Sequence, residues 1–132
     1  MRGAQTVLRL QHVALPFPGT AASISDARRF YGEVLRLPEL PVPSGLADGV
    51  MWFATGDQEI HLYAEPSGVA ANEESTRHPC FEVADVTAVR EHLAGQGVDT
   101  IDGVPNLPGR PRFFVRDPFG NALEFVELSP SK

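Results

Sequence analysis

The chain has 132 residues, of which 42% are hydrophobic and 21% charged, as is typical of a globular protein. This length suits one domain, and we expect residues 1–132 to fold as a unit. The net charge of −6 argues against nucleic acid as a partner, because phosphate binding requires clustered Lys and Arg. No apolar run approaches the roughly 20 residues of a membrane span, and the single Cys80 suits a reducing compartment, so we expect no membrane partner and a cytoplasmic location.

The first predicted elements are a strand and a helix. His12 lies in an apolar run, Leu8–Leu15, which predicts a mostly buried strand with His12 on a face of the sheet. Apolar residues then recur at three- and four-residue steps through residues 27–35, which predicts an amphipathic helix. Ser23 and Asp26 resemble a capping box and place the start of that helix near Ser23.

The rest of the first half reads as a loop followed by a hairpin. Residues 38–49 are rich in proline and glycine, which predicts a loop or an irregular edge. Residues 50–54 form the next expected strand, and residues 55–58 have the composition of a turn. Residues 59–64 complete the hairpin, with His61 in the middle of the returning strand.

The second half repeats this order. Residues 78–83 predict a short apolar strand that begins at a histidine. Asp85 is a good N-cap for a helix with an apolar stripe, and Gly95 and Gly97 supply its end. Residues 98–101 then have the composition of another short strand.

The final segment again alternates loop, strand, turn and strand. Residues 103–111 hold several prolines and glycines, which predicts a long loop before a strand at 113–116. Residues 117–120, Asp-Pro-Phe-Gly, fit a type I turn. Residues 122–128 return as a strand that carries Glu124. Each half is therefore strand, helix and about three strands, which indicates an α+β fold.

The chain thus contains two tandem βαβββ modules, about 7–66 and 76–129, with no linker long enough to separate domains. Four metal-ligand side chains stand at equivalent points of the two modules: His12, His61, His78 and Glu124. Three imidazoles and a carboxylate so placed suit one metal site shared between two repeats. Such donors bind iron(II), manganese, nickel, cobalt or zinc, and the sequence does not choose among these divalent metals.

Several stretches carry a resemblance to a known family: His12-Val13-Ala14-Leu15, Phe30-Tyr31, Glu59-Ile60-His61-Leu62, His78–Val83, and Phe114–Asn121 leading into Leu123-Glu124-Phe125. With these residues the chain resembles the glyoxalase, bleomycin-resistance and extradiol-dioxygenase superfamily, also called vicinal oxygen chelate proteins. The resemblance covers about residues 8–128. The run 117–124 and the phased histidines are specific together, whereas each is weak alone.

The resemblance implies a curved, cup-like mixed sheet with the helices outside and a divalent metal on the concave face. The ligands it implies are His12, His61, His78 and Glu124. His12, His78 and Glu124 alone can form a facial set, with His61 as a fourth ligand or as an acid/base. The resemblance also implies a homodimer that covers exposed strand edges, and the ligands then come from one chain or from two.

The implied reaction is chelation of two adjacent oxygens of a small-molecule substrate. It leads either to lyase- or isomerase-type proton transfer, with Glu124 as the base, or to extradiol-type ring dioxygenation. Bacterial glutathione-dependent glyoxalase I has a carboxylate at the position of His61, an arginine at that of Pro16 and an asparagine at that of Glu65. These departures argue against glutathione as the substrate.

Two other functions stay open. One is a bleomycin-resistance-type binding protein without catalysis, in which aromatic residues line the groove: Trp52, Phe53, Phe113 or Phe119. The other is a fosfomycin-resistance-type thiol transferase, which needs a metal and a cationic anion pocket. Four arginines permit such a pocket: Arg77, Arg110, Arg112 and Arg116.

The remaining reactive side chains are expected to have structural roles. His92 lies on the polar side of the second helix, where we expect it to be solvated. Cys80 alternates with apolar neighbours and is expected to be a small core residue rather than a nucleophile. By strand alternation, Glu59 and Glu82 are expected to point away from the metal.

Overall fold

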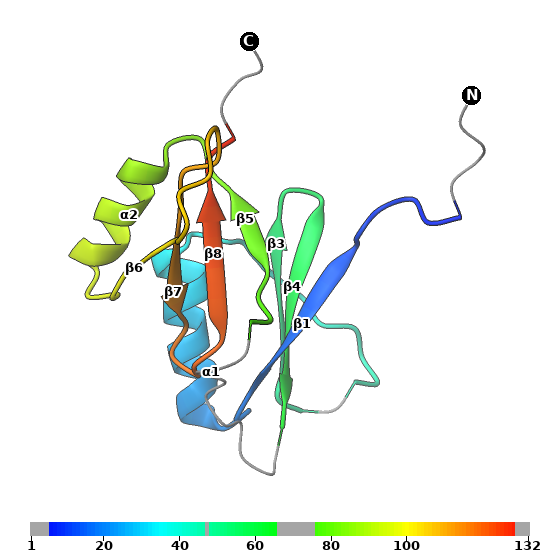
Figure 1. Cartoon of the computed structure of the whole chain (residues 1–132). Coiled ribbons are helices and arrows are strands. Elements are labelled where there is room, and N and C mark those ends of the chain that lie inside the picture. The colour runs from blue at the N-terminus through cyan, green and yellow to red at the C-terminus, as the bar shows by residue number, and fades with distance from the viewer. Residues whose placement is uncertain (1–5, 47, 66–75, 129–132) are drawn as a thin grey trace.

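The computed structural model describes residues 6–46, 48–65 and 76–128, and it contains the same succession of elements twice (Figure 1). The first module comprises β1 (His12–Phe17), α1 (Ala21–Ala27) continued by the π-helix η1 (Arg28–Val34), β2 (Glu39–Leu40), β3 (Val50–Thr55) and β4 (Gln58–Ala64). The second comprises β5 (Cys80–Glu82), α2 (Val86–Gly95), β6 (Ile101–Asp102), β7 (Arg112–Arg116) and β8 (Ala122–Val126). The predicted α+β fold of two βαβββ modules is confirmed.

Each module builds one four-stranded sheet with the same topology. The strand orders are β1-β4-β3-β2 and β5-β8-β7-β6. In both sheets the first and last strands of the module pair in parallel, and the other pairs are antiparallel. β1 and β5 therefore lie at equivalent edges (Figure 1).

One hydrophobic cluster joins the two sheets. Alternation along β4 points Ile60 and Leu62 inward, and alternation along β8 does the same for Leu123 and Phe125. Buried residues of α1, η1 and α2 fill the same cluster. We call the face of each sheet that is turned away from this cluster its outer face. The residues between the inward ones, His61 and Glu124 among them, belong to the outer faces.

Hydrogen bonds also link the two modules. The hydroxyl of Tyr31 in η1 donates to Asp117 Oδ2 at 2.6 Å, and Asn121 Nδ2 donates to the carbonyl of Pro16 at 2.9 Å. Asp117 begins the predicted turn, which is closed by a bond from the Gly120 amide to the Asp117 carbonyl. Burial raises the pKa of Asp117, although four donated hydrogen bonds oppose the rise.

The start of the first strand differs from the prediction. The apolar residues Leu8 and Leu10 are exposed, by 89% and 65%, and the strand begins only at His12. The physical reason is the length of its partner. β4 starts at Gln58, so the last backbone bond on this side runs from the Glu59 amide to the Gln11 carbonyl, and earlier residues have no strand to pair with.

The first helix also starts earlier than predicted. Its N-cap is Thr20, whose hydroxyl accepts a hydrogen bond from the amide of Ser23, and Ser23 lies buried inside the first turn. The prediction for the second helix is confirmed, because Asp85 caps it by accepting from the Ala88 amide. None of the helices in the described ranges is long and apolar enough to cross a membrane.

Candidate functional site

The first pair of predicted ligands lies on the outer face of the first sheet. The imidazoles of His12 and His61 are stacked, with centroids 4.0 Å apart and planes 17° apart. Trp52 lies directly opposite His61 on β3 and covers the other side of the His61 ring. The two ring centroids are 4.1 Å apart, and the planes differ by 3°. His61 is therefore only 3% exposed, although it lies on an outer face.

The two nitrogens of His61 have different surroundings. Nε2 lies 2.8 Å from Oε1 of Glu59, and this hydrogen bond lowers the pKa of Glu59. Nδ1 is buried and has no hydrogen-bond partner in the described part of the chain. A carboxylate only accepts, so Nε2 carries a proton, and in the neutral ring Nδ1 then presents a lone pair. A histidine that is backed by a carboxylate and has its other nitrogen free is the usual form of a metal ligand.

The prediction for Glu59 is wrong. Alternation was expected to turn it away from His61, but residues two apart on a strand share a face, and the two side chains are hydrogen bonded. Glu59 thus belongs to the candidate site, and a correct count along the strand would have found it.

The stacked rings of His12 and His61 cannot both bind one ion as they stand. An imidazole lone pair lies in the plane of its ring, and two nearly parallel planes 4.0 Å apart do not meet near the rings. His12 is exposed and its Nδ1 contacts only the neighbouring Gln11 side chain, at 2.7 Å. Joint binding therefore requires His12 to turn out of the stack.

The second pair lies on the outer face of the second sheet. His78 stands just before β5, and its Nε2 lies 2.9 Å from Oε1 of Glu124. Its Nδ1 lies 2.7 Å from the carbonyl of Thr76, so Nδ1 must be the donor there. In a neutral ring Nε2 would then carry no proton. Its lone pair would face a lone pair of the carboxylate oxygen, which is unfavourable. A second proton on the ring, or a cation, must lie between the two groups.

A cation and a thiol lie beside Glu124. Arg112 Nη1 is 3.7 Å from Glu124 Oε2, and Cys80 is the direct strand partner of Glu124. Burial, followed by the charge of Glu124, raises the pKa of Cys80 to about 11, while Arg110 and Arg112 oppose the rise. The prediction that Cys80 is a core residue is wrong, because Phe81 takes the inward position and Cys80 is exposed.

The strand register makes the two pairs equivalent. Ala14 pairs with His61, and Cys80 pairs with Glu124. In each module the first histidine comes two residues before the residue that faces the second ligand. An aromatic residue stands opposite the second ligand in both sheets, Trp52 in one and Phe114 in the other.

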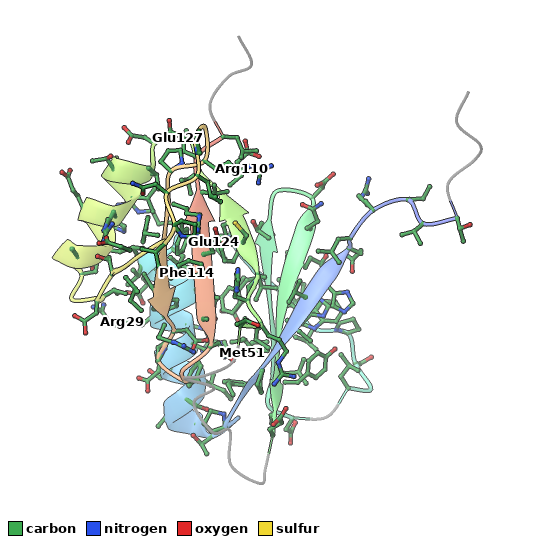
Figure 2. All side chains as sticks on the ribbon, in the orientation of Figure 1. Arg29, Met51, Arg110, Phe114, Glu124 and Glu127 are labelled. Carbon is green, nitrogen blue, oxygen red and sulfur yellow. The ribbon has the colours of Figure 1, made fainter. Side chains whose placement is uncertain are left out.

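The structure does not bring the two pairs together within one chain. Across residues 6–46, 48–65 and 76–128, no group of three or more His, Cys, Asp or Glu side chains is placed to hold a metal ion. The pairs lie on the outer faces of separate sheets, whose inner faces share one core. Figure 2 shows Glu124 and Phe114 on the side of the molecule formed by β7 and β8, apart from β1 and β4.

Other predicted residues have different positions. His92 is not simply solvated, because its Nε2 lies 2.8 Å from the Val34 carbonyl at the end of η1. Phe53 and Phe113 belong to the core, and Phe119 packs edge-on against Phe17. Of the aromatic residues suggested for a binding groove, Trp52 lies on an outer face.

Comparisons with known proteins agree with this fold. A glyoxalase family protein from Bacillus anthracis is 35% identical, with a TM-score of 0.83 over 98% of this chain and 100% of that one. An antibiotic binding protein from Streptomyces sp. CB03234 is 21% identical, with a TM-score of 0.72 over 96% of this chain and all of that one. Lactoylglutathione lyase from Agrobacterium tumefaciens is 20% identical, with a TM-score of 0.70 over 93% of this chain and 96% of that one. The last two show a shared fold alone.

A comparison with curated proteins gives no match. The family model described as the Glyoxalase/Bleomycin resistance protein/Dioxygenase superfamily matches residues 9–125, which span both modules and all four predicted ligands. The chain therefore belongs to this superfamily.

Proposed function

We propose that the protein is a metal-dependent enzyme that acts on a small molecule with two adjacent oxygen atoms. The observation that carries this proposal is the buried, unpartnered Nδ1 of His61, whose ring is oriented by Glu59. A buried polar atom without a partner is costly, and a metal ion supplies the missing partner. The close approach of His78 Nε2 and Glu124 Oε1 also supports the proposal, because a metal cation would satisfy both groups as a shared proton does.

We further propose that one site takes His12 and His61 from one protomer and His78 and Glu124 from its partner in a homodimer. The two pairs face away from a shared core, so one folded chain cannot unite them without losing that core. Each pair also adjoins an edge strand, β1 or β5, that is open to a second copy. A two-fold axis would then generate two identical sites.

The exposed apolar segment before β1 supports such a dimer. Val7, Leu8 and Leu10 are between 65% and 89% exposed and immediately precede His12. Their burial against a second copy would stabilise the same interface that completes the site. His12 would leave its stack on His61 when that interface forms and the metal binds.

In this proposal the metal, when bound, polarises the two substrate oxygens as a Lewis acid. Glu124 removes a proton from substrate carbon and holds it on a carboxylate oxygen. Arg112, 3.7 Å from Glu124 Oε2, orients that carboxylate, and Trp52 and Phe114 keep water from the two sides of the site. The three imidazoles and one carboxylate suit iron(II), manganese, nickel, cobalt or zinc.

A second candidate is a binding protein without catalysis. The stacked column of His12, His61 and Trp52 offers a flat aromatic surface, which favours a planar ligand. The antibiotic binding protein from Streptomyces has the same fold. In this case the rings of His12 and His61 would stay stacked and no metal would be required.

Elemental analysis separates the two candidates. We would purify tag-free protein without chelators, partly under anaerobic conditions, and compare the His78→Ala variant with His92→Gln, which changes a histidine outside both pairs. We expect about one transition metal per chain, lost in His78→Ala and kept in His92→Gln. Iron would direct assays to dioxygenation, and nickel, zinc or manganese to proton transfer. Absence of metal even after reconstitution would overturn the enzyme and leave the binding protein.

A further inference from the structure

A cationic cavity lies beside the second ligand pair. The loop between β6 and β7 forms a cavity of about 330 Å³ that is open to solvent. Its described lining includes Arg110 and Arg112 and contains no acidic side chain. This volume lies at the lower end of the range for small-molecule sites, so it suits one group of a substrate. Two cations without a carboxylate in the lining are notable in a chain of net charge −6.

The cavity holds Arg112 in a fixed position. Its Nη2 donates to the carbonyl of Pro105 at 3.0 Å, and its guanidinium lies 5.7 Å from the centroid of the Phe114 ring. Gly103 covers it closely, because a Cβ added at Gly103 would lie 2.7 Å from Arg112 Cγ and 2.9 Å from Nη1. A preoriented guanidinium loses little freedom when it binds an anion.

The hydrogen bonding of Arg112 is incomplete. Its side chain is 11% exposed, yet Nε is buried and has no acceptor among the described residues. The distance from Nη1 to Glu124 Oε2, 3.7 Å, is too long for a hydrogen bond. An arginine has five N–H donors, and leaving a buried charged donor without an acceptor is unfavourable. An anionic oxygen is the acceptor that this arrangement lacks.

Arg110 adds a second charge on the same side. It is exposed, and together with Arg112 it acts electrostatically on Cys80, the strand partner of Glu124. Figure 2 shows Arg110, Glu124 and Phe114 gathered along β7 and β8. The cavity and the proposed base therefore adjoin.

We propose that Arg110 and Arg112 form an anion subsite that binds a carboxylate or phosphate group of the substrate beside Glu124. The substrate class is then a small molecule that carries an oxyanion group in addition to its two adjacent oxygens. As a statement about substrate this rests on the proposed function, whereas anion binding itself does not require the metal. The largely buried Arg112 anchors the anion, and the exposed Arg110 adds a second positive charge in the same lining.

The test uses the metal-free full chain and follows the arginine Nε–Hε signals by NMR. The probes are inorganic phosphate and acetate, titrated at constant ionic strength against chloride. We expect saturable shifts of the Arg112 and Arg110 signals in the wild type. The Arg110 signal follows binding in the Arg112→Gln variant, which has no Arg112 signal. Affinity should fall at least about tenfold in Arg112→Gln and also in Gly103→Ala, whose new Cβ displaces the guanidinium while keeping its charge.

The matched control is Arg29→Gln, which removes an exposed arginine far along the chain from the cavity and should leave the affinity unchanged. Shifts that do not saturate, or an equal loss in Arg29→Gln, would overturn the subsite and indicate only general surface charge. Because no metal is present, a negative result here leaves the metal proposal standing. Conversely, a protein that binds phosphate but no metal would retain the subsite and lose the proposed enzyme.

Discussion

The two half-sites, one on each outer face, share a backbone plan and differ in chemistry. In the first module the ligand pair is two stacked imidazoles, with His61 almost fully buried under Trp52. In the second it is an imidazole beside a carboxylate, with side chains 28% and 13% exposed and Arg112 nearby. Identical strand register thus fixes where the candidate ligands lie, while the side chains decide the chemistry of each half-site.

The difference indicates a division of roles. The first half-site is the preorganised one, because Glu59 and Trp52 fix the ring and tautomer of His61. In the proposed function, the second half-site supplies the carboxylate that acts as a base, with Arg112 beside it. Among the residues that the structure describes, neither half-site has the three or more protein ligands that a metal centre usually requires.

The largest effect is expected when the preorganised ligand is removed. The variant His61→Ala should lower metal affinity by more than about 100-fold, because loss of even an outer partner commonly costs about 10- to 100-fold. Competition with a fluorescent chelator measures it, with His92→Gln as the control. Unchanged affinity in His61→Ala would place the metal elsewhere and leave the first half-site without a role in binding.

The partner of His61 should have a smaller effect. In Glu59→Gln the amide can still contact Nε2 but no longer fixes the tautomer, so metal affinity should fall about 10- to 100-fold. The same competition assay applies, and Glu82→Gln, on β5 of the other module, is the matched control. Equal affinities in the two variants would mean that Glu59 does not orient His61.

The sequence predicted most of the fold because hydrophobic period and turn residues agree in both halves. The prediction failed where contacts between distant parts of the chain decide the extent of a strand or the direction of a face. The exposure of Leu8 and Leu10 follows from the length of β4, and no local signal reports it. The similar spacing of His12 and His61 in one half and of His78 and Glu124 in the other indicated equivalent positions correctly. Spacing contains no information on which faces two modules turn toward each other, so the separation of the pairs could not be predicted.

The junction between the modules should contribute to stability without touching either half-site. Tyr31→Phe removes the hydroxyl that donates to buried Asp117, and we expect a loss of about 1.5–3 kcal/mol in the free energy of unfolding. Urea denaturation measures it, and Tyr63→Phe on the outer face of the first sheet is the control. A loss no larger than in that control would mean that this bond does not hold the half-sites in place.

The smallest effect concerns Cys80, which stands where the first module has Ala14. With a pKa of about 11, the thiol is almost entirely protonated at pH 7 and should react slowly with Ellman's reagent in the metal-free protein. The rate should rise about tenfold per pH unit toward pH 11. Glu124→Gln removes a charge that raises this pKa, so it should speed the reaction at pH 8. A slower reaction in that variant would contradict the assigned contact.

The most direct test of the shared metal site is complementation between two defective chains. His61→Ala and Glu124→Ala would be co-expressed with different tags that bind no metal, and the mixed dimer isolated by both tags in turn. A site built across two chains leaves one complete set per mixed dimer, so we predict about half the wild-type metal content, while each variant alone binds none. A mixed dimer without metal, or failure to recover any dimer, would contradict the account.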